Sequence, residues 1–244
     1  MSRTHVALLL ATAVAAPVGA RAARRYYGET YSAATAPPGG LDLEGWTTFH
    51  QAPRAGGSDF WRHQLEVETG LTDRWDVALY GMLKQESRLR FEGAKLESRF
   101  RVSEPGRWPV DLVLYLEVKK EVIEDKPWAL EQKVILARDF RAVNVSANLV
   151  AEQEFIPGGG REYEYGYAVG ASYELHPSLR IGAEAFGGWT NVREGGSSSW
   201  ERQHWAGPAV SIAASRFWLV LAAGFGLTDE SDRTRLRAVL AVQL

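Results

Sequence analysis

The sequence predicts an all-β protein: a closed, antiparallel, up-and-down transmembrane β-barrel of about 12 strands. Three observations support this prediction. From Leu41 to Leu244, apolar residues alternate with charged or small residues in stretches of about ten, separated by turn residues. The connections between these stretches alternate between short and long. Aromatic residues gather near the ends of the stretches, as they do at membrane–water interfaces.

Residues 1–22 have the pattern of a secretory signal peptide. Arg3 gives the segment a basic start, residues 6–16 form a short apolar run, and small residues precede an expected cleavage site after Ala22. The apolar run is too short to cross a bilayer as a helix, for which about 20 residues are needed. A short core helix is the alternative interpretation. The signal peptide predicts export from the cytoplasm.

The segment that follows, residues 23–40, is rich in Tyr, Ala, Pro and Gly and has no period. We expect it to be an extended periplasmic lead-in to the barrel. Residues 41–244 then form the barrel itself. Within them the alternation predicts strands at residues 41–50, 60–71, 75–84, 91–102, 110–122, 128–139, 143–155, 163–175, 179–189, 204–215, 217–227 and 235–244.

Each predicted strand has one apolar face. In residues 110–122, Leu112, Leu114 and Leu116 share one face, while Asp111 and Glu117 lie on the other. A soluble antiparallel sheet with one buried face alternates in the same way, so alternation alone does not decide the class. The connections favour the membrane barrel, because short periplasmic turns and longer outer loops are typical of bacterial outer-membrane barrels.

The face opposite the apolar one carries charges of both signs. If the connection after residue 102 turns near Gly106, Arg101 faces Asp111 and Lys95 faces Glu117. If the next connection turns near residue 125, Glu117 faces Lys133 and Lys119 faces Glu131, so opposite charges meet throughout. The predicted lumen charge cluster is therefore Lys95, Arg101, Asp111, Glu117, Lys119, Glu131 and Lys133. It serves either to neutralise the wall and fix the register or to act as a selectivity zone.

The sequence offers no pattern for catalysis or for a cofactor. Four histidines remain after the predicted cleavage site, His50, His63, His176 and His204, and none is predicted to lie beside a serine on the lumen face. There is no Gly-x-Ser-x-Gly motif, no His-x-x-x-His spacing and no cysteine. We therefore expect no enzyme activity, no cofactor and no metal site. An outer-membrane hydrolase is the least favoured alternative.

Two predicted loops are rich in glycine or serine. Residues 158–160 are three glycines, but they lie between two strands and lack the helix of a phosphate-binding loop. Residues 190–203 form the longest predicted outer loop, with charges, serines and Trp200. We expect this loop either to fold into the lumen and contact a ligand or to be a solvated surface loop.

Several short motifs resemble one family of outer-membrane barrel proteins, named for meta-pathway phenol degradation. The motifs are residues 41–45 (LDLEG), 70–75 (GLTDRW), 177–186, 206–208 (AGP) and 226–232 (GLTDESD). The resemblance runs from about Leu41 to the end of the chain and implies a barrel in the outer membrane. The family name implies a link to aromatic catabolism but brings no catalytic residues. The chain departs from many outer-membrane barrels by ending in Leu244 instead of Phe.

Together these patterns predict a passive outer-membrane channel or transporter for small solutes, with apolar and aromatic solutes among the candidates. The alternative is a closed structural barrel that acts through its outer loops. The expected partners are the lipid bilayer, lipopolysaccharide, the barrel-assembly machinery at the C-terminal strand, and a small-molecule solute. The formal net charge of −2 does not favour nucleic acid.

Overall fold

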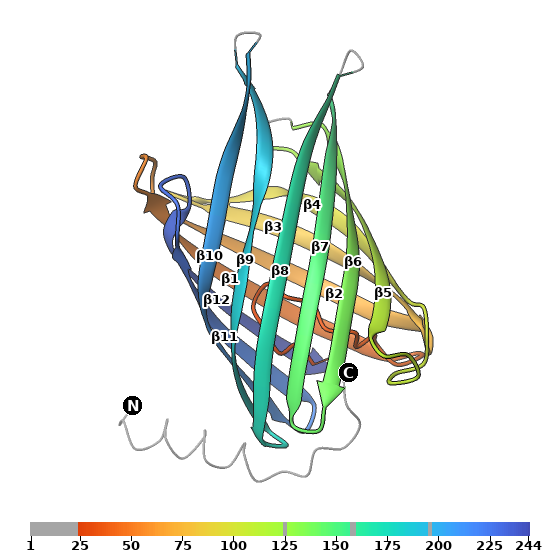
Figure 1. The fold of residues 1–244 in the computed structure, drawn as a ribbon. Helices are drawn as coiled ribbons and strands as arrows, with labels where there is room; N and C mark the ends of the chain where they lie inside the picture. The colour runs from red at the N-terminus through yellow and green to blue at the C-terminus, as the bar shows by residue number, and fades with distance from the viewer. Residues whose placement is uncertain (1–23, 124–125, 157–159, 195–196) are drawn as a thin grey trace.

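The computed structural model describes residues 24–123, 126–156, 160–194 and 197–244. Within them the chain forms a closed barrel of 12 antiparallel strands, in which each strand pairs with its sequence neighbours and β1 pairs with β12 (Figure 1). The strands are β1 (Leu41–Pro53), β2 (Phe60–Thr72), β3 (Trp75–Gln85), β4 (Leu89–Arg101), β5 (Asp111–Glu121), β6 (Trp128–Phe140), β7 (Val143–Ile156), β8 (Gly160–His176), β9 (Leu179–Glu194), β10 (Ser197–Ala214), β11 (Phe217–Gly226) and β12 (Asp232–Gln243). The predicted fold class is confirmed.

The two faces of each strand differ as predicted. On β5, Leu114 is 47% exposed on the outside of the barrel, whereas its neighbour Tyr115 is 3% exposed on the inside. The same outward face recurs around the barrel at Leu43, Leu65, Leu79, Leu96, Leu114, Val134, Leu149, Val169, Ile181, Leu221 and Leu240. Such a continuous apolar belt on a closed barrel is the surface of a membrane-spanning protein.

Most of the predicted aromatic belt is also outside. Trp75, Trp128 and Phe217 are exposed at strand ends, where amphipathic rings favour the membrane interface. Trp205 is an exception, because it is buried in the lumen, stacked on Phe186 with ring centroids 5.4 Å apart. Its place on the inward face of β10 follows from the alternation of that strand.

The barrel has two unlike ends. At one end, two-residue turns join β6 to β7 and β10 to β11, and in each turn a residue takes a positive φ: Arg141 at 55° and Ser215 at 53°. This end also holds the first residue of β1 and the last residue of β12. The opposite end carries the longer hairpins β7–β8 and β9–β10, which rise above the rest of the barrel (Figure 1).

The predicted loop at residues 190–203 is wrong over most of its length. β9 continues to Glu194 and β10 begins at Ser197, with the two strands still paired, so the segment is a hairpin that extends the barrel wall instead of folding inward (Figure 1). Serine, threonine and tryptophan are compatible with a strand, and pairing to a neighbour decides the outcome. Residues 195–196 and 157–159, which include two of the three glycines, lie outside the described residues.

The predicted strand registers on either side of β5 are wrong by two residues. Lys95 faces Lys119, Arg101 faces Val113, and Glu117 faces Glu131. A shift of two leaves every side chain on its predicted face, so the apolar pattern cannot detect it. For β4 and β5 the predicted turn centre is wrong, because the connection at residues 102–110 is irregular rather than a tight hairpin.

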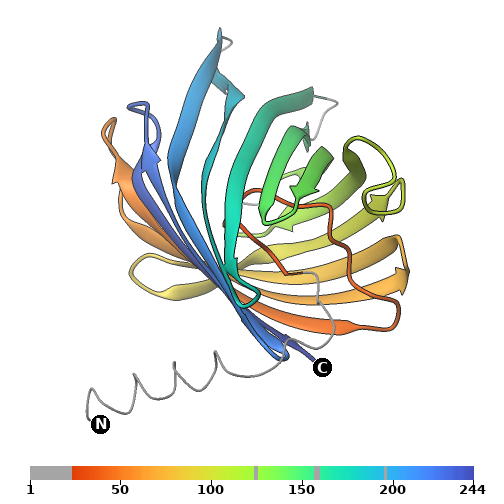
Figure 2. The same cartoon turned by 60° about the horizontal axis from the view of Figure 1, so that its bottom comes forward.

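Residues 24–40 lie inside the barrel, which corrects the expected periplasmic lead-in. Figure 2 shows this segment inside the ring of strands, and Tyr27, Thr30 and Ala36 are fully buried there. A barrel of this size has more interior than its own wall side chains fill, and the polar wall groups need partners. We call residues 24–40 the lumen segment. Residues 1–23, including the predicted signal peptide, lie outside the described residues.

Candidate functional site in the barrel lumen

One carboxylate holds the innermost turn of the lumen segment. Glu184, on the inward face of β9, accepts hydrogen bonds from the backbone N–H groups of Gly28 (2.8 Å), Glu29 (2.9 Å) and Thr30 (2.9 Å). It also accepts one from the hydroxyl of Thr30, at 3.0 Å. Hydrogen bonds to a charged acceptor are about twice as strong as neutral ones. Glu184 is therefore the main attachment point of the segment.

A side-chain amide provides a second attachment. The Oδ1 atom of Asn148 accepts the backbone N–H of Tyr31 at 2.7 Å, and its Nδ2 atom donates to the carbonyl of the same residue at 3.0 Å. This reciprocal pair imitates the bonding between two β-strands. It ties the segment to β7.

The wall has space for the segment because small residues lie beneath it. The Tyr27 hydroxyl donates to Asn144 Oδ1 at 2.9 Å and lies 3.1 Å from the Ser172 hydroxyl. Its ring lies over Gly170 on β8, where a Cβ atom would meet the ring at 2.7 Å. A residue larger than glycine at this position would displace Tyr27.

Ion pairs fix the charged residue at the tip of the segment. Glu29 lies 2.6 Å from Arg237 Nη1 and 3.5 Å from Arg235 Nη1, both on β12. Burial would raise the pKa of the Glu29 carboxyl, but the two guanidinium groups outweigh burial and hold the pKa below its usual value. Glu29 is therefore ionised at neutral pH.

The return limb runs back along β2 and β3. The backbone N–H of Ala36 donates to Asp76 Oδ2 at 2.8 Å, and Pro38 forms a parallel bridge with Gly70. At Gly70 a Cβ atom would lie 2.2 Å from the Pro37 carbonyl oxygen. This glycine allows the segment to pass close to the wall before β1 begins.

The structure brings most of the predicted charge cluster together around the lumen segment. Lys95 binds Glu117 at 2.9 Å, and Lys133 binds Glu131 at 2.8 Å. The Lys133 ammonium also lies over two aromatic rings, at 4.2 Å from Tyr115 and 4.7 Å from Tyr31 of the lumen segment. The cluster is thus in contact with the segment, which the sequence pattern did not predict.

Three predicted members have other partners. Lys119 binds Glu152 of β7 at 3.0 Å and not Glu131. Arg101 donates to the Asp73 carbonyl in the β2–β3 turn, and Asp111 accepts the Gly106 N–H at 2.6 Å. Arg101 and Asp111 therefore lie at the tight-turn end and stabilise turns.

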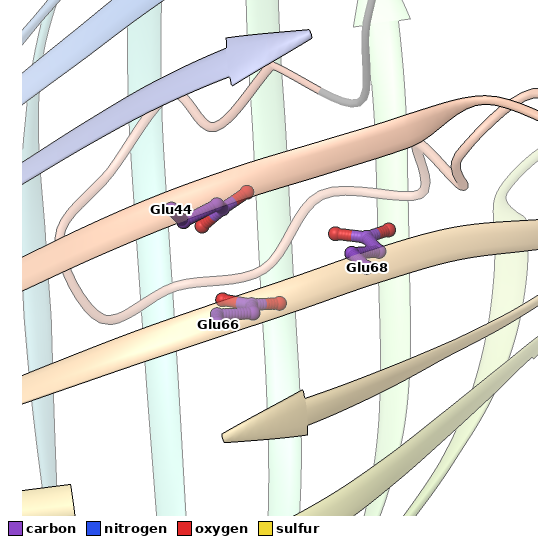
Figure 3. A group of neighbouring side chains, drawn as sticks. All are labelled: Glu44, Glu66 and Glu68. Atoms are coloured by element: carbon purple, nitrogen blue, oxygen red, sulfur yellow. The ribbon is translucent and has the colours of Figure 1, made fainter. Parts of the chain in front are cut away.

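Four acidic residues on β1 and β2 were missed. Asp42, Glu44, Glu66 and Glu68 point into the lumen beside the lumen segment, and all are fully buried. We call them the acid cluster; Figure 3 shows the last three. The Trp46 indole N–H lies 3.1 Å from Glu44 Oε2 and 2.9 Å from Glu66 Oε2. The alternation in LDLEG and LEVE places these acids opposite the lipid-facing leucines and was the signal available in the sequence.

The lumen segment has cavities on both of its sides. Toward the tight turns, a cavity of about 490 Å³ is lined by Arg24, Tyr26 and Thr35 of the segment and by Asp111 of the wall. Toward the long hairpins, two cavities of about 210 Å³ each share Glu29 and Lys133 in their walls. The segment therefore divides the lumen.

Within the described part of the chain, His176 lies beside a serine. His176 Nδ1 is 2.7 Å from the Ser178 hydroxyl in the tight β8–β9 turn, but the same nitrogen faces the Ser178 backbone N–H at 3.3 Å. Both contacts are local and close the turn. Elsewhere His50 binds Asp232 at 2.8 Å and stacks on Phe60.

Among the described residues, no helix is long and apolar enough to cross a bilayer.

Solved structures of outer-membrane channels have a similar fold. The COG4313 outer membrane channel from Pseudomonas putida F1 is similar over 85% of this chain and 96% of its own, with a TM-score of 0.64 and 12% sequence identity. The porin NanC is similar over 84% of this chain and 100% of its own, with a TM-score of 0.57 and 11% identity. At these identities the likeness is one of fold. No family model and no curated protein sequence matches the chain, so the resemblance to the phenol-degradation family stays a prediction.

Proposed function

We propose that the protein is an outer-membrane channel for small solutes whose passage is restricted by its own lumen segment. The observation that carries this proposal is the position of residues 24–40, which divide the lumen into cavities on both sides. The segment is held by hydrogen bonds and ion pairs at Glu184, Asn148, Arg235 and Arg237. Polar contacts of this kind exchange with water more readily than an apolar core does, so the segment is suited to rearrange.

The lining favours solutes with both polar and aromatic character. The cavities toward the long hairpins carry lysines, glutamates and the rings of Tyr31 and Tyr167. Paired charges of both signs select weakly for net charge, while aromatic rings offer stacking surfaces. The proposed solutes therefore include small aromatic molecules. The fold likeness to the COG4313 channel and to NanC supports passage in general.

The location and the other partners are part of the same proposal. Three features support insertion in an outer membrane, in contact with lipid and lipopolysaccharide. They are the apolar belt, the predicted signal peptide, and the position of the tight turns, which lie at the same end of the barrel as the start of β1 and the end of β12. The barrel-assembly machinery would act on β12 and on the exposed Leu244 that follows it.

A closed structural barrel that acts through its outer end is the second candidate. The observation in its favour is the β7–β8 and β9–β10 pair of hairpins, which project beyond the barrel wall (Figure 1). In that case the lumen segment would be a permanent filling.

Liposome swelling separates the two candidates. The full chain, refolded into liposomes and shown by a heat-dependent gel shift to have inserted, is compared with empty liposomes for arabinose and for benzoate. Swelling with both solutes supports a channel open to aromatic solutes. Swelling with arabinose alone supports a channel that does not admit aromatic solutes. No swelling with either solute supports the closed barrel.

A further inference from the structure

The acid cluster is an unusually dense group of buried carboxylates. In the β1–β2 ladder Asp42 faces Glu68 and Glu44 faces Glu66, so like charges are directly opposite in two successive pairs. Each of the four residues is 1% exposed. One carboxylate oxygen from each of Glu44, Glu66 and Glu68 lies within 4.8 Å of the other two, and Figure 3 shows the three side chains near one another on β1 and β2. Like charges opposite each other destabilise a sheet unless something between them compensates.

The cationic side chains around the cluster do not balance it. Arg99 contacts Glu68, Asp76 and Glu97, and Arg25 Nε lies 3.7 Å from Glu44. Asp76 and Glu97 are buried beside the cluster and add to its negative charge. Six carboxylates thus share this part of the wall with two guanidinium groups. Buried charges without partners are strongly destabilising, so a further positive charge is required if these groups are ionised.

Several oxygens in the cluster lack any hydrogen-bond donor. Both carboxylate oxygens of Asp42 are buried without a partner, as are Glu44 Oε1 and Glu66 Oε1. Asp42 lies directly opposite Glu68 in the β1–β2 ladder, so a fourth buried and unpartnered carboxylate lies beside the group. Buried polar atoms are nearly always satisfied, and a bare buried carboxylate indicates an ion or water that completes it.

We propose that Glu44, Glu66 and Glu68 bind a divalent cation, with Ca²⁺ as the preferred ion, and that the neighbouring buried carboxylate of Asp42 adds negative charge to the site. All available ligands are carboxylate oxygens, which suit hard cations and not the softer zinc or copper. Two oxygens that each lie about 2.3–2.6 Å from a Ca²⁺ ion are at most about 5.2 Å apart, and the three oxygens here lie within 4.8 Å of one another. Ca²⁺ is preferred over Mg²⁺ because Mg²⁺ dehydrates reluctantly and usually keeps several waters, whereas this site is buried and built from carboxylates.

The ion would also affect the lumen segment. Arg25 lies between the rings of Tyr31 and Trp46, with its guanidinium carbon 4.0 and 4.3 Å from the two ring centroids. It reaches Glu44 only at the edge of the cluster, and its two Nη atoms are without hydrogen-bond partners. A cation in the cluster would hold β1 and β2 together at the place where the lumen segment begins its path through the barrel. This inference does not depend on whether the barrel conducts.

Terbium luminescence tests the site directly, because Tb³⁺ occupies calcium sites and emits when an adjacent tryptophan is excited. Trp46 is in contact with the cluster and supplies the sensitiser. The full chain is refolded in detergent without lipopolysaccharide, either with Tb³⁺ present or with Tb³⁺ added afterwards, since the site is buried. We expect emission on tryptophan excitation, displacement by Ca²⁺ in preference to Mg²⁺, and weaker emission with Trp46→Phe.

The binding variants are Glu44→Gln with Glu66→Gln, and Asp42→Asn alone as a milder change. Each should weaken Tb³⁺ binding by about tenfold or more. The matched control is Glu152→Gln, which neutralises a lumen carboxylate that is paired with Lys119. A heat-dependent gel shift confirms folding, and Asp42→Asn carries the test if the double variant fails to fold. Equal Tb³⁺ affinity in Asp42→Asn and Glu152→Gln, or folded protein that takes up no Tb³⁺ and no Ca²⁺, would overturn the proposal and leave protons as the neutralising charge.

Discussion

Lys95 on β4 faces Lys119 on β5, yet the Lys95 ammonium binds Glu117 at 2.9 Å. Glu117 is also on β5, two residues before Lys119. This ion pair therefore forms along a diagonal instead of straight across the sheet. A long lysine side chain reaches such a diagonal partner easily. Both side chains are largely buried, so the pair is shielded from solvent.

A double-mutant cycle measures this pair. Lys95→Met and Glu117→Gln should each destabilise the barrel, and their coupling energy should be about 0.5–3 kcal/mol in refolding experiments, because the residues are in contact. The control cycle uses Arg101→Met and Asp111→Asn, which a register shifted by two would have paired and which the structure separates. Coupling between Arg101 and Asp111 would contradict the observed register, because the register shifted by two pairs these two residues as well as Lys95 and Glu117.

A charged substitution tests which face of each strand meets lipid. Leu149→Arg on β7 should cost about 2–4 kcal/mol of folding free energy, because Leu149 is 59% exposed on the lipid-facing surface and arginine is costly there. Gln64→Arg is the control, since Gln64 lines a water-accessible lumen cavity. Denaturant titrations in lipid vesicles give both values. Equal losses in the two variants would show that the assigned faces are wrong.

Glu184 should control the release of the lumen segment. Glu184→Gln replaces a charged acceptor of three backbone N–H groups by a neutral one, which should weaken the attachment by about 1.5–3 kcal/mol. The chain has no cysteine, so Ala36→Cys provides a single reporter at a buried position. Maleimide should label this cysteine at least several times faster when Glu184→Gln is present. Glu201→Gln, an exposed acid on β10, is the control and should leave the rate unchanged.

Acidification should release the same segment. The pKa of Glu29 is lowered in the folded barrel, since Arg237 and Arg235 overcome the effect of burial. A group with a lowered pKa stabilises the bound state above its ordinary pKa of 4.5, and this contribution is lost as the pH falls through the lowered value. Labelling of Ala36→Cys, tested with a thiol reagent active in acid, should therefore accelerate below about pH 4. In Glu29→Gln labelling should be faster at neutral pH and should respond less to acid; an unchanged acid response would assign the effect to other carboxylates.

The sequence patterns predicted the barrel wall well, because the alternation within each strand alone determines which residues face lipid and which face the lumen. In β5, β7 and β12 the apolar alternation alone identified the lipid-facing residues, and most strand ends fell within three residues of their observed positions. The ends of β9 and β10 were missed, because a polar hairpin is held by pairing and not by an apolar face. The strand register could not be predicted from the pattern either, since shifting a strand by two residues leaves every side chain on the same face.

The lumen contents could not be predicted for a different reason. The contacts of the lumen segment join residues far apart in the chain, as Tyr31 and Asn148 do, through polar groups that have no period. The acid cluster was visible as alternating acids in residues 42–44 and 66–68, but only the β1–β2 register places them opposite one another. Side-chain pairs across long sequence distances require the closed fold before they can be recognised.

Single-channel conductance tests the central claim, that residues 24–40 restrict an otherwise open barrel. Planar-bilayer recordings compare the full chain with a variant lacking residues 24–36, both shown to be folded by a heat-dependent gel shift. We predict small or infrequent current steps for the full chain and larger, steady ohmic steps for the shortened variant. Equal conductance in the two proteins, or silence from the inserted shortened variant, would contradict the account.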